Sequence, residues 1–301
     1  MSIQRIRLAR TRNSLLLGVV VFAFLGPAAP AAGQGSTAPS VGVQAPPPMS
    51  VAEAQALVKK APNDSNSYLA LGAAYRRERN YSQAEQAFQK MASLDPKNST
   101  AYVSLGAVYM DMGRSDDALR EFKKALKINP SDAAAHYNLG SYYMLTGKRD
   151  DAMSEFRKAT QYPPPLPDAW VSLGLIEAEI GKMNEAIADY KKALAIDSTN
   201  VRALCNLGNA YYGMGKISDA TALYRKALRI DPKNQDAYYN LAVAFADAQI
   251  YREAINYWRK TVAIDSTTTI AESAKNSIQV LQEFLDQQKA TAPAGQSPGS
   301  H

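Results

Sequence analysis

The stretch NLGSYYMLTG, residues 138–147, returns with few changes as NLGNAYYGMG, residues 206–215. The two copies lie 68 residues apart, which is twice 34. Stepping by 34 from Ser65 gives six consecutive units with no insertion or deletion. A fixed period of this length predicts an array of identical supersecondary units. The units are residues 65–98, 99–132, 133–166, 167–200, 201–234 and 235–268.

Certain places in each unit keep one kind of residue. The seventh place is always leucine, and the twenty-fourth is always aromatic. Apolar residues recur with helical spacing in both halves of a unit, which predicts two amphipathic helices. The eighth place is glycine in five units and the twentieth is alanine in all six, so that the two helices approach closely. These small residues are Gly72, Gly106, Gly140, Gly174, Gly208, Ala84, Ala118, Ala152, Ala186, Ala220 and Ala254.

This pattern resembles the tetratricopeptide repeat, a helix–turn–helix unit of the same length. The resemblance covers residues 65–268. It implies an all-α fold, a right-handed α-solenoid of stacked helix pairs. A single pair cannot bury its apolar stripe alone, so neighbouring pairs must stack.

The two ends of such an array require elements that cover the first and last pairs. Residues 50–64 fall in register with a second helix and predict an N-terminal half-repeat. Residues 269–290 carry an apolar stripe opposite a polar face and predict a C-terminal capping helix.

The N-terminal residues 1–33 have the order of a secretory signal peptide, with arginines first, then an apolar run, then small residues. The apolar run, residues 15–25, is too short to span a bilayer comfortably. We therefore expect cleavage near residues 31–33 and export to the periplasm or cell envelope; an uncleaved N-terminal membrane anchor is the alternative. Residues 34–49 predict a disordered Pro/Ala/Gly linker, and residues 291–301 a disordered tail.

Composition argues against several classes of function. The net charge is +6, but four of the 34 basic residues stand in the first twelve positions, and the other 30 face 28 acidic residues. Because the charges of the residues after the first twelve nearly balance, we expect no nucleic-acid partner. One cysteine and two histidines predict no metal site and no internal disulfide. No phosphate-binding loop or nucleophile motif is present, so we expect neither an enzyme nor a cofactor.

In the tetratricopeptide family the first helices line a concave groove, where ligands usually bind. An asparagine row at the sixth place suits an extended peptide, because amides both donate and accept hydrogen bonds. Tyrosine adds contact area, and arginine can hold a carboxylate. The alternative is that asparagine before Leu-Gly only helps helix packing. The groove residues that the resemblance implies are Tyr137, Asn138, Arg202, Asn206, Asn209, Tyr212, Tyr239 and Asn240.

One subtype of groove is excluded. A clamp for C-terminal carboxylates needs lysine and arginine at places that hold Cys205, Ile270 and Ala274 here. We expect Cys205 to be a small packing residue, and we expect the same of His136. Glu177 replaces the tyrosine of its sibling units, and the sequence leaves its role open between a local pocket and a groove feature.

The sequence thus predicts a non-catalytic protein–protein interaction scaffold or adaptor of the cell envelope, with a partner peptide or protein in the concave groove. Two other functions remain open. One is a self-assembling structural protein, and the other is a binder of glycans or small ligands, which the same tyrosines and asparagines would also suit. The sequence fixes neither the partner nor the oligomeric state.

Overall fold

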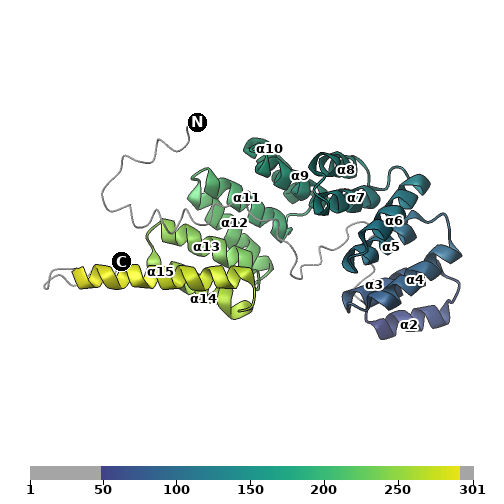
Figure 1. The fold of residues 1–301 in the computed structure, drawn as a ribbon, viewed down its shortest axis with the longest axis horizontal. Helices are drawn as coiled ribbons and strands as arrows, with labels where there is room; N and C mark the ends of the chain where they lie inside the picture. Colours follow the sequence, from purple (N-terminus) through teal and green to yellow (C-terminus); the bar gives the residue numbers. More distant parts are fainter. Residues whose placement is uncertain (1–48, 292–301) are drawn as a thin grey trace. The chain divides into compact units, whose positions relative to one another are not determined.

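A computed structural model describes residues 49–291. These residues form fourteen helices and no strand (Figure 1). They divide into two compact bodies, an N-terminal body of residues 49–210 and a C-terminal body of residues 211–291. The predicted signal peptide lies outside the described residues, as do the predicted linker and tail except for Met49 and Thr291.

The N-terminal body begins with a single helix, which lies against the first of a series of helix pairs. Each pair contacts the next, so that α4 packs on α5, α6 on α7 and α8 on α9. The helices are α2 (Val51–Lys60), α3 (Ser65–Arg77), α4 (Tyr81–Leu94), α5 (Ser99–Asp111), α6 (Ser115–Ile128), α7 (Ala133–Leu145), α8 (Arg149–Gln161), α9 (Pro167–Glu179), α10 (Met183–Ile196) and most of α11 (Val201–Gly213).

The C-terminal body contains the end of α11 and four further helices. Here α12 packs on α13, α13 on α14, and the long last helix on both α13 and α14. The helices are α12 (Ile217–Ile230), α13 (Gln235–Asp247), α14 (Tyr251–Ile264) and α15 (Thr269–Thr291). The all-α solenoid predicted from the sequence is confirmed.

Polar caps fix where the first helices begin. Asp64, Asn98, Asp132 and Asn234 each accept a hydrogen bond from a main-chain N–H of the first turn. Such caps satisfy donors that have no partner inside the helix. These four first helices therefore start at the first place of their 34-residue repeats, and α9 starts at the same place with Pro167 and no side-chain cap.

A tight turn joins the two helices of a pair. Four of these turns place glycine in the left-handed region, for example Gly113 at φ 73°. Arg79 and Gln249 adopt the same conformation in the first and last repeats, at φ 60° and 61°. Side chains with a Cβ adopt this region at a cost, so these two turns are less favourable than the glycine turns.

In the first four pairs, an aromatic ring of the second helix lies over a glycine of the first. A Cβ added at Gly106 would lie 2.4 Å from the ring of Phe122, and one at Gly174 would lie 2.6 Å from the ring of Tyr190. Both rings are nearly or fully buried. The six alanines of the twentieth place are 0% exposed. Because no space is left around them, we expect a larger side chain there to push the two helices apart.

Candidate partner-binding surface

Three of the predicted groove residues lie on one face of α11 in the N-terminal body. Arg202, Asn206 and Asn209 are spaced by four and three residues, which brings them onto one side of the helix. Arg202 and Asn209 are exposed, and Asn206 is half-buried. The neighbouring Cys205 is buried, 8% exposed, as expected of a packing residue.

Asp168 on α9 connects this face to the preceding first helix. Its Oδ1 accepts a hydrogen bond from Nδ2 of Asn200 at 3.3 Å and lies 3.9 Å from Nη1 of Arg202. The Arg202 side chain remains 43% exposed, while that of Asp168 is only 14% exposed. The Arg202–Asp168 contact is long and the guanidinium remains solvent-exposed, so we expect the pair to contribute little to stability.

Tyr137 and Asn138 occupy a different environment from the other predicted groove residues. Tyr137 is 4% exposed, and its ring centroid lies 5.5 Å from that of Phe156. Asn138 is 8% exposed, and its Nδ2 donates to the Ala134 carbonyl at 2.8 Å. The Asn138 amide is therefore buried and hydrogen-bonded within its own helix. We leave both residues out of the proposed contact surface.

The C-terminal body holds the other three predicted groove residues. The Tyr212 hydroxyl donates a hydrogen bond to Asp247 of α13. Tyr239 is half-buried, with its ring centroid 6.4 Å from that of Trp258. Burial raises the pKa of the Tyr239 hydroxyl, and a hydrogen bond with Ser277 opposes this rise. Asn240 follows on the same helix and is half-buried.

Sequence reasoning missed the polar bridges between consecutive first helices. In the N-terminal body, Nε of Arg76 on α3 pairs with Asp111 on α5. This pair occupies the same repeat places, twelve and thirteen, as Tyr212 and Asp247 in the C-terminal body. The signal in the sequence is an acid at the thirteenth place of alternate repeats, where Glu179 stands between Asp111 and Asp247.

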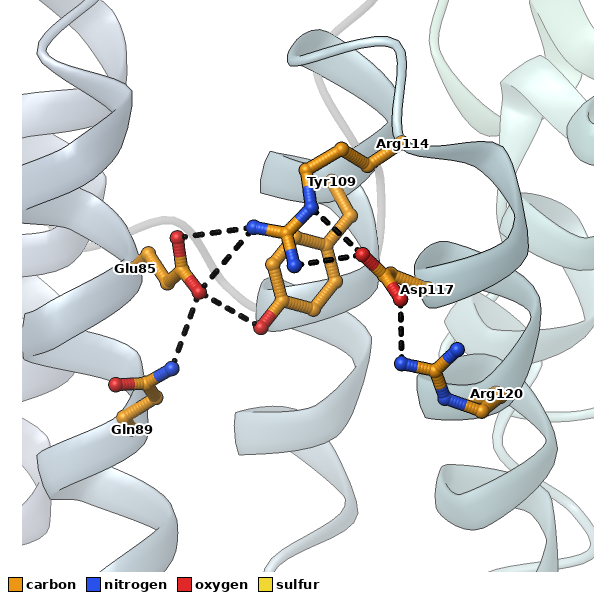
Figure 2. A network of polar contacts seen from close by, with 6 residues as sticks. All are labelled: Glu85, Gln89, Tyr109, Arg114, Asp117 and Arg120. Carbon is orange, nitrogen blue, oxygen red and sulfur yellow. Dashed lines mark hydrogen bonds and ion pairs between the residues drawn. The ribbon is translucent and has the colours of Figure 1, made fainter.

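A second polar network joins the first two repeats (Figure 2). The Tyr109 hydroxyl donates to Glu85 of α4 at 2.9 Å, and Gln89 donates to the same carboxylate at 3.1 Å. The Arg114 guanidinium lies 4.3 Å from the Tyr109 ring centroid and 2.6 Å from Asp117. Its hydrogen bond to Asp117 raises the pKa of Arg114 and lowers that of the carboxyl. The network connects α4, α5 and α6.

Glu177 stands at the eleventh place of the fourth repeat, where Tyr109 stands in the second. It is 8% exposed, and its Oε2 has no hydrogen-bond partner among the described residues. Burial raises the pKa of this carboxyl, and the negative charge of Asp189 raises it further. The charges of Arg157 and Lys182 oppose the rise. Lys182 donates its main-chain N–H to the Glu177 carbonyl at 2.7 Å, and the carboxylate Oε2 remains without a partner among the described residues. The misfit that the sequence revealed is thus a buried, poorly compensated carboxyl group.

His136 is a buried packing residue. Its ring contacts Oε2 of Glu155 at 2.6 Å and the Pro130 carbonyl at 3.0 Å, and it stacks on Tyr162. Residues 49–291 contain no group of three or more His, Cys, Asp or Glu side chains placed to hold a metal ion. In the same range, no helix has both the length and the apolar character needed to cross a bilayer.

A family model described as the C-terminal domain of cilia and flagella-associated protein 70, a tetratricopeptide-repeat domain, matches residues 38–278. The chain belongs to this tetratricopeptide-repeat family. None of the curated proteins compared with the chain matches it.

Solved structures share the fold at low sequence identity. The crystal structure of the APC/C hetero-tetramer Cut9-Hcn1 has a TM-score of 0.67 and 19% identity, covering 76% of this chain and 45% of that chain. This chain therefore spans less than half the length of that relative. Pseudomonas aeruginosa pilF has a TM-score of 0.61 and 18% identity, with 74% and 97% covered. PilW, a widely conserved type IV pilus biogenesis factor, has a TM-score of 0.59 and 23% identity, with 69% and 97% covered.

Proposed function

We propose that this chain is a protein–protein interaction scaffold that holds an extended segment of a partner against its first helices. The observation that carries the proposal is the solvated Arg202 guanidinium, 3.9 Å from Asp168 and on the same helix face as two asparagine amides. Membership of the tetratricopeptide family supports it. The proposal assigns the chain no catalytic step.

The chemistry of this surface suits a peptide main chain with a nearby acidic group. Arginine presents several N–H donors in a planar fork, which matches a carboxylate. Asn206 and Asn209 can each donate to a carbonyl and accept from an N–H, so they bind backbone without selecting side chains. We therefore propose that the partner segment is extended and carries an acidic residue or a C-terminal carboxylate opposite Arg202.

The C-terminal body offers a second surface of similar chemistry. Tyr212, Tyr239 and Asn240 combine aromatic area with polar groups, which is typical of peptide contacts. We propose these three residues as further partner contacts on that body.

We also propose that the protein acts in the periplasm or cell envelope, with residues 1–33 as a cleaved signal peptide, residues 34–49 as a linker and residues 291–301 as a tail. The order of charged, apolar and small residues supports export. The mass of the full chain after expression in a bacterium with an intact secretion pathway tests this. Loss of about the first 31–33 residues in the exported fraction is expected, whereas a full-length chain in the membrane fraction would favour the anchor.

Selection from a displayed library of random peptides tests the binding proposal on the full chain. We expect selected peptides to share an acidic residue, and to bind an Arg202→Ala/Asn206→Ala variant about tenfold or more weakly. A variant with Arg229→Ala and Asn256→Ala, both exposed on second helices, removes the same residue types elsewhere and should bind like the wild type. Circular dichroism checks that all variants remain helical.

Two results would count against the scaffold proposal. Unchanged affinity in the Arg202→Ala/Asn206→Ala variant would remove this face of α11 from binding. A concentration-dependent oligomer in light scattering that the same substitutions dissociate would assign the face to self-assembly instead.

A further inference from the structure

The last helix leaves an open groove on the C-terminal body. Helix α15 packs on α13 and α14, and no helix among the described residues follows it. A shallow cavity of about 350 Å³ lies between α14 and α15. It is lined by Arg259, Val262 and Ala263 of α14 and by Lys275, Ile278, Gln279 and Gln282 of α15.

The groove combines an apolar floor with positive charge. Val262, Ala263 and Ile278 supply apolar contact surface. Arg259 and Lys275 are both exposed, and the lining contains no carboxylate. A hydrogen bond of 2.9 Å from Lys275 Nζ to the Ser266 carbonyl holds this amine between the two helices.

The groove lies where α15 packs on α14, the second helix of the sixth repeat. Helix α15 begins at Thr269, the first place of a seventh 34-residue period, so Lys275 stands at the seventh place and Gln279 at the eleventh. The eleventh place faces the second helix of the preceding repeat in the second repeat as well, where Tyr109 donates to Glu85 of α4. The groove is therefore bounded by the side of α15 that faces α14.

The residues of α15 disfavour a second copy of this chain stacked on it in the manner of the repeats. Lys275 replaces the leucine of the seventh place, and Asn276 replaces the small residue of the eighth. In the first four repeats the eighth place lies under an aromatic ring, and a Cβ at Gly72 would come within 2.4 Å of Phe88. An incoming second helix of the same sequence would meet the Asn276 side chain and bury the Lys275 ammonium.

We propose that the groove between α14 and α15 binds an acidic amphipathic helix of a partner protein. Its apolar side chains would pack on Val262, Ala263 and Ile278, and its carboxylates would pair with Arg259 and Lys275. Helix-in-groove binding of this kind uses apolar anchors at every third and fourth position, with charge complementarity at the rim.

The proposal is tested on the full chain with a fluorescent peptide that carries leucine at every third and fourth position and glutamate elsewhere. We expect saturable binding in fluorescence anisotropy. Reversal of both charges, Arg259→Glu with Lys275→Glu, is expected to weaken it about tenfold or more. Ala263→Tyr, which fills the floor without a change of charge, is expected to weaken it as well.

Three controls separate the groove from general charge and from the α11 face. Arg252→Glu with Lys289→Glu makes the same charge change outside the groove lining and should leave binding intact. The Arg202→Ala/Asn206→Ala variant should also bind this peptide normally, so the two proposals fail independently. Circular dichroism confirms that each variant is folded.

Several results would overturn the inference. They are absence of binding by the acidic peptide, equal binding of a peptide with lysine in place of glutamate, and unchanged binding by the Arg259→Glu/Lys275→Glu variant. A dimer in light scattering that this variant converts to monomer would give the groove to a second copy and would equally contradict the proposal.

Discussion

Tyr109 and Glu177 occupy the same place in two repeats of the N-terminal body, yet their surroundings differ. Tyr109 donates a hydrogen bond to Glu85 and lies under the Arg114 guanidinium, in a network that reaches α6 (Figure 2). Glu177 is buried to a similar degree, but its Oε2 has no hydrogen-bond partner among the described residues. Beneath both, an aromatic ring lies over a glycine in the same way.

The difference shows that the repeat and the site are set by different interactions. The repeat pattern places a side chain at a given position in the helix pair, because the ring and glycine fix the distance between the helices. The neighbouring helix then decides whether that side chain is satisfied. At Tyr109 it supplies Glu85 and Gln89, whereas at Glu177 the preceding helix supplies the charge of Arg157 but leaves Oε2 without a hydrogen-bond partner among the described residues.

Removal of the shared ring should give the largest effect. Phe122→Ala and Tyr190→Ala are each expected to reduce the free energy of unfolding by about 3–5 kcal/mol, because each leaves a cavity in a closely packed pair. Urea denaturation followed by circular dichroism measures this. A loss of stability well below this range at only one of the two sites would show that the two helix pairs are not packed in the same way.

Exchange of the residues tests the role of the neighbours. Tyr109→Glu is expected to destabilise the protein by about 2–4 kcal/mol, because a carboxylate would be buried beside Glu85. Tyr109→Phe, which only removes the hydroxyl group, serves as the control, with an expected loss of about 1 kcal/mol. Equal losses in the two variants would mean that the charge of the neighbouring helix does not matter here.

Removal of the Glu177 charge should have the opposite sign. Glu177→Gln is expected to stabilise the fold by about 1 kcal/mol at neutral pH. The pKa of Glu177 is raised in the folded state, so its ionisation disfavours folding as pH rises above the unfolded value. In acid, where both states are protonated, the gain should vanish.

Unfolding measured from acid to neutral pH checks this prediction. Glu179→Gln replaces an exposed carboxylate on the same helix. The stability difference between this variant and the wild type should not increase comparably with pH. If the gain in free energy of unfolding of the Glu177→Gln variant over the wild type stayed constant with pH, this would contradict the burial of an ionised group.

The turn between the two helices of a repeat should give the smallest effect. Its left-handed position holds glycine in four repeats but Arg79 and Gln249 in the first and last. Gln249→Gly is expected to stabilise the protein by about 0.5 kcal/mol, because Gln249 has a φ of 61°. Gly113→Gln is the reverse change, and no atom lies within 4 Å of an added Cβ there. It should therefore destabilise the protein through the backbone alone, by about 1 kcal/mol. Thermal denaturation of both variants measures the pair.

Part of the candidate site could be predicted from the sequence and part could not. The fixed spacing placed Arg202, Asn206 and Asn209 correctly on one face of a first helix. It could not distinguish Asn206 from Asn138, which holds the equivalent place two repeats earlier but is buried. Exposure depends on the side chains of neighbouring repeats, which a pattern within one repeat does not contain.

The sequence by itself determined the period, the two helices of each repeat, and the small residues under the rings, because these depend on contacts within 34 residues. Only the tertiary structure decided that Glu177 lacks a hydrogen-bond partner for one oxygen, that Asn138 bonds its own helix, and that α14 and α15 leave an open groove. These features arise where one helix meets another, and the balance of burial, charge and hydrogen bonding there depends on both partners at once.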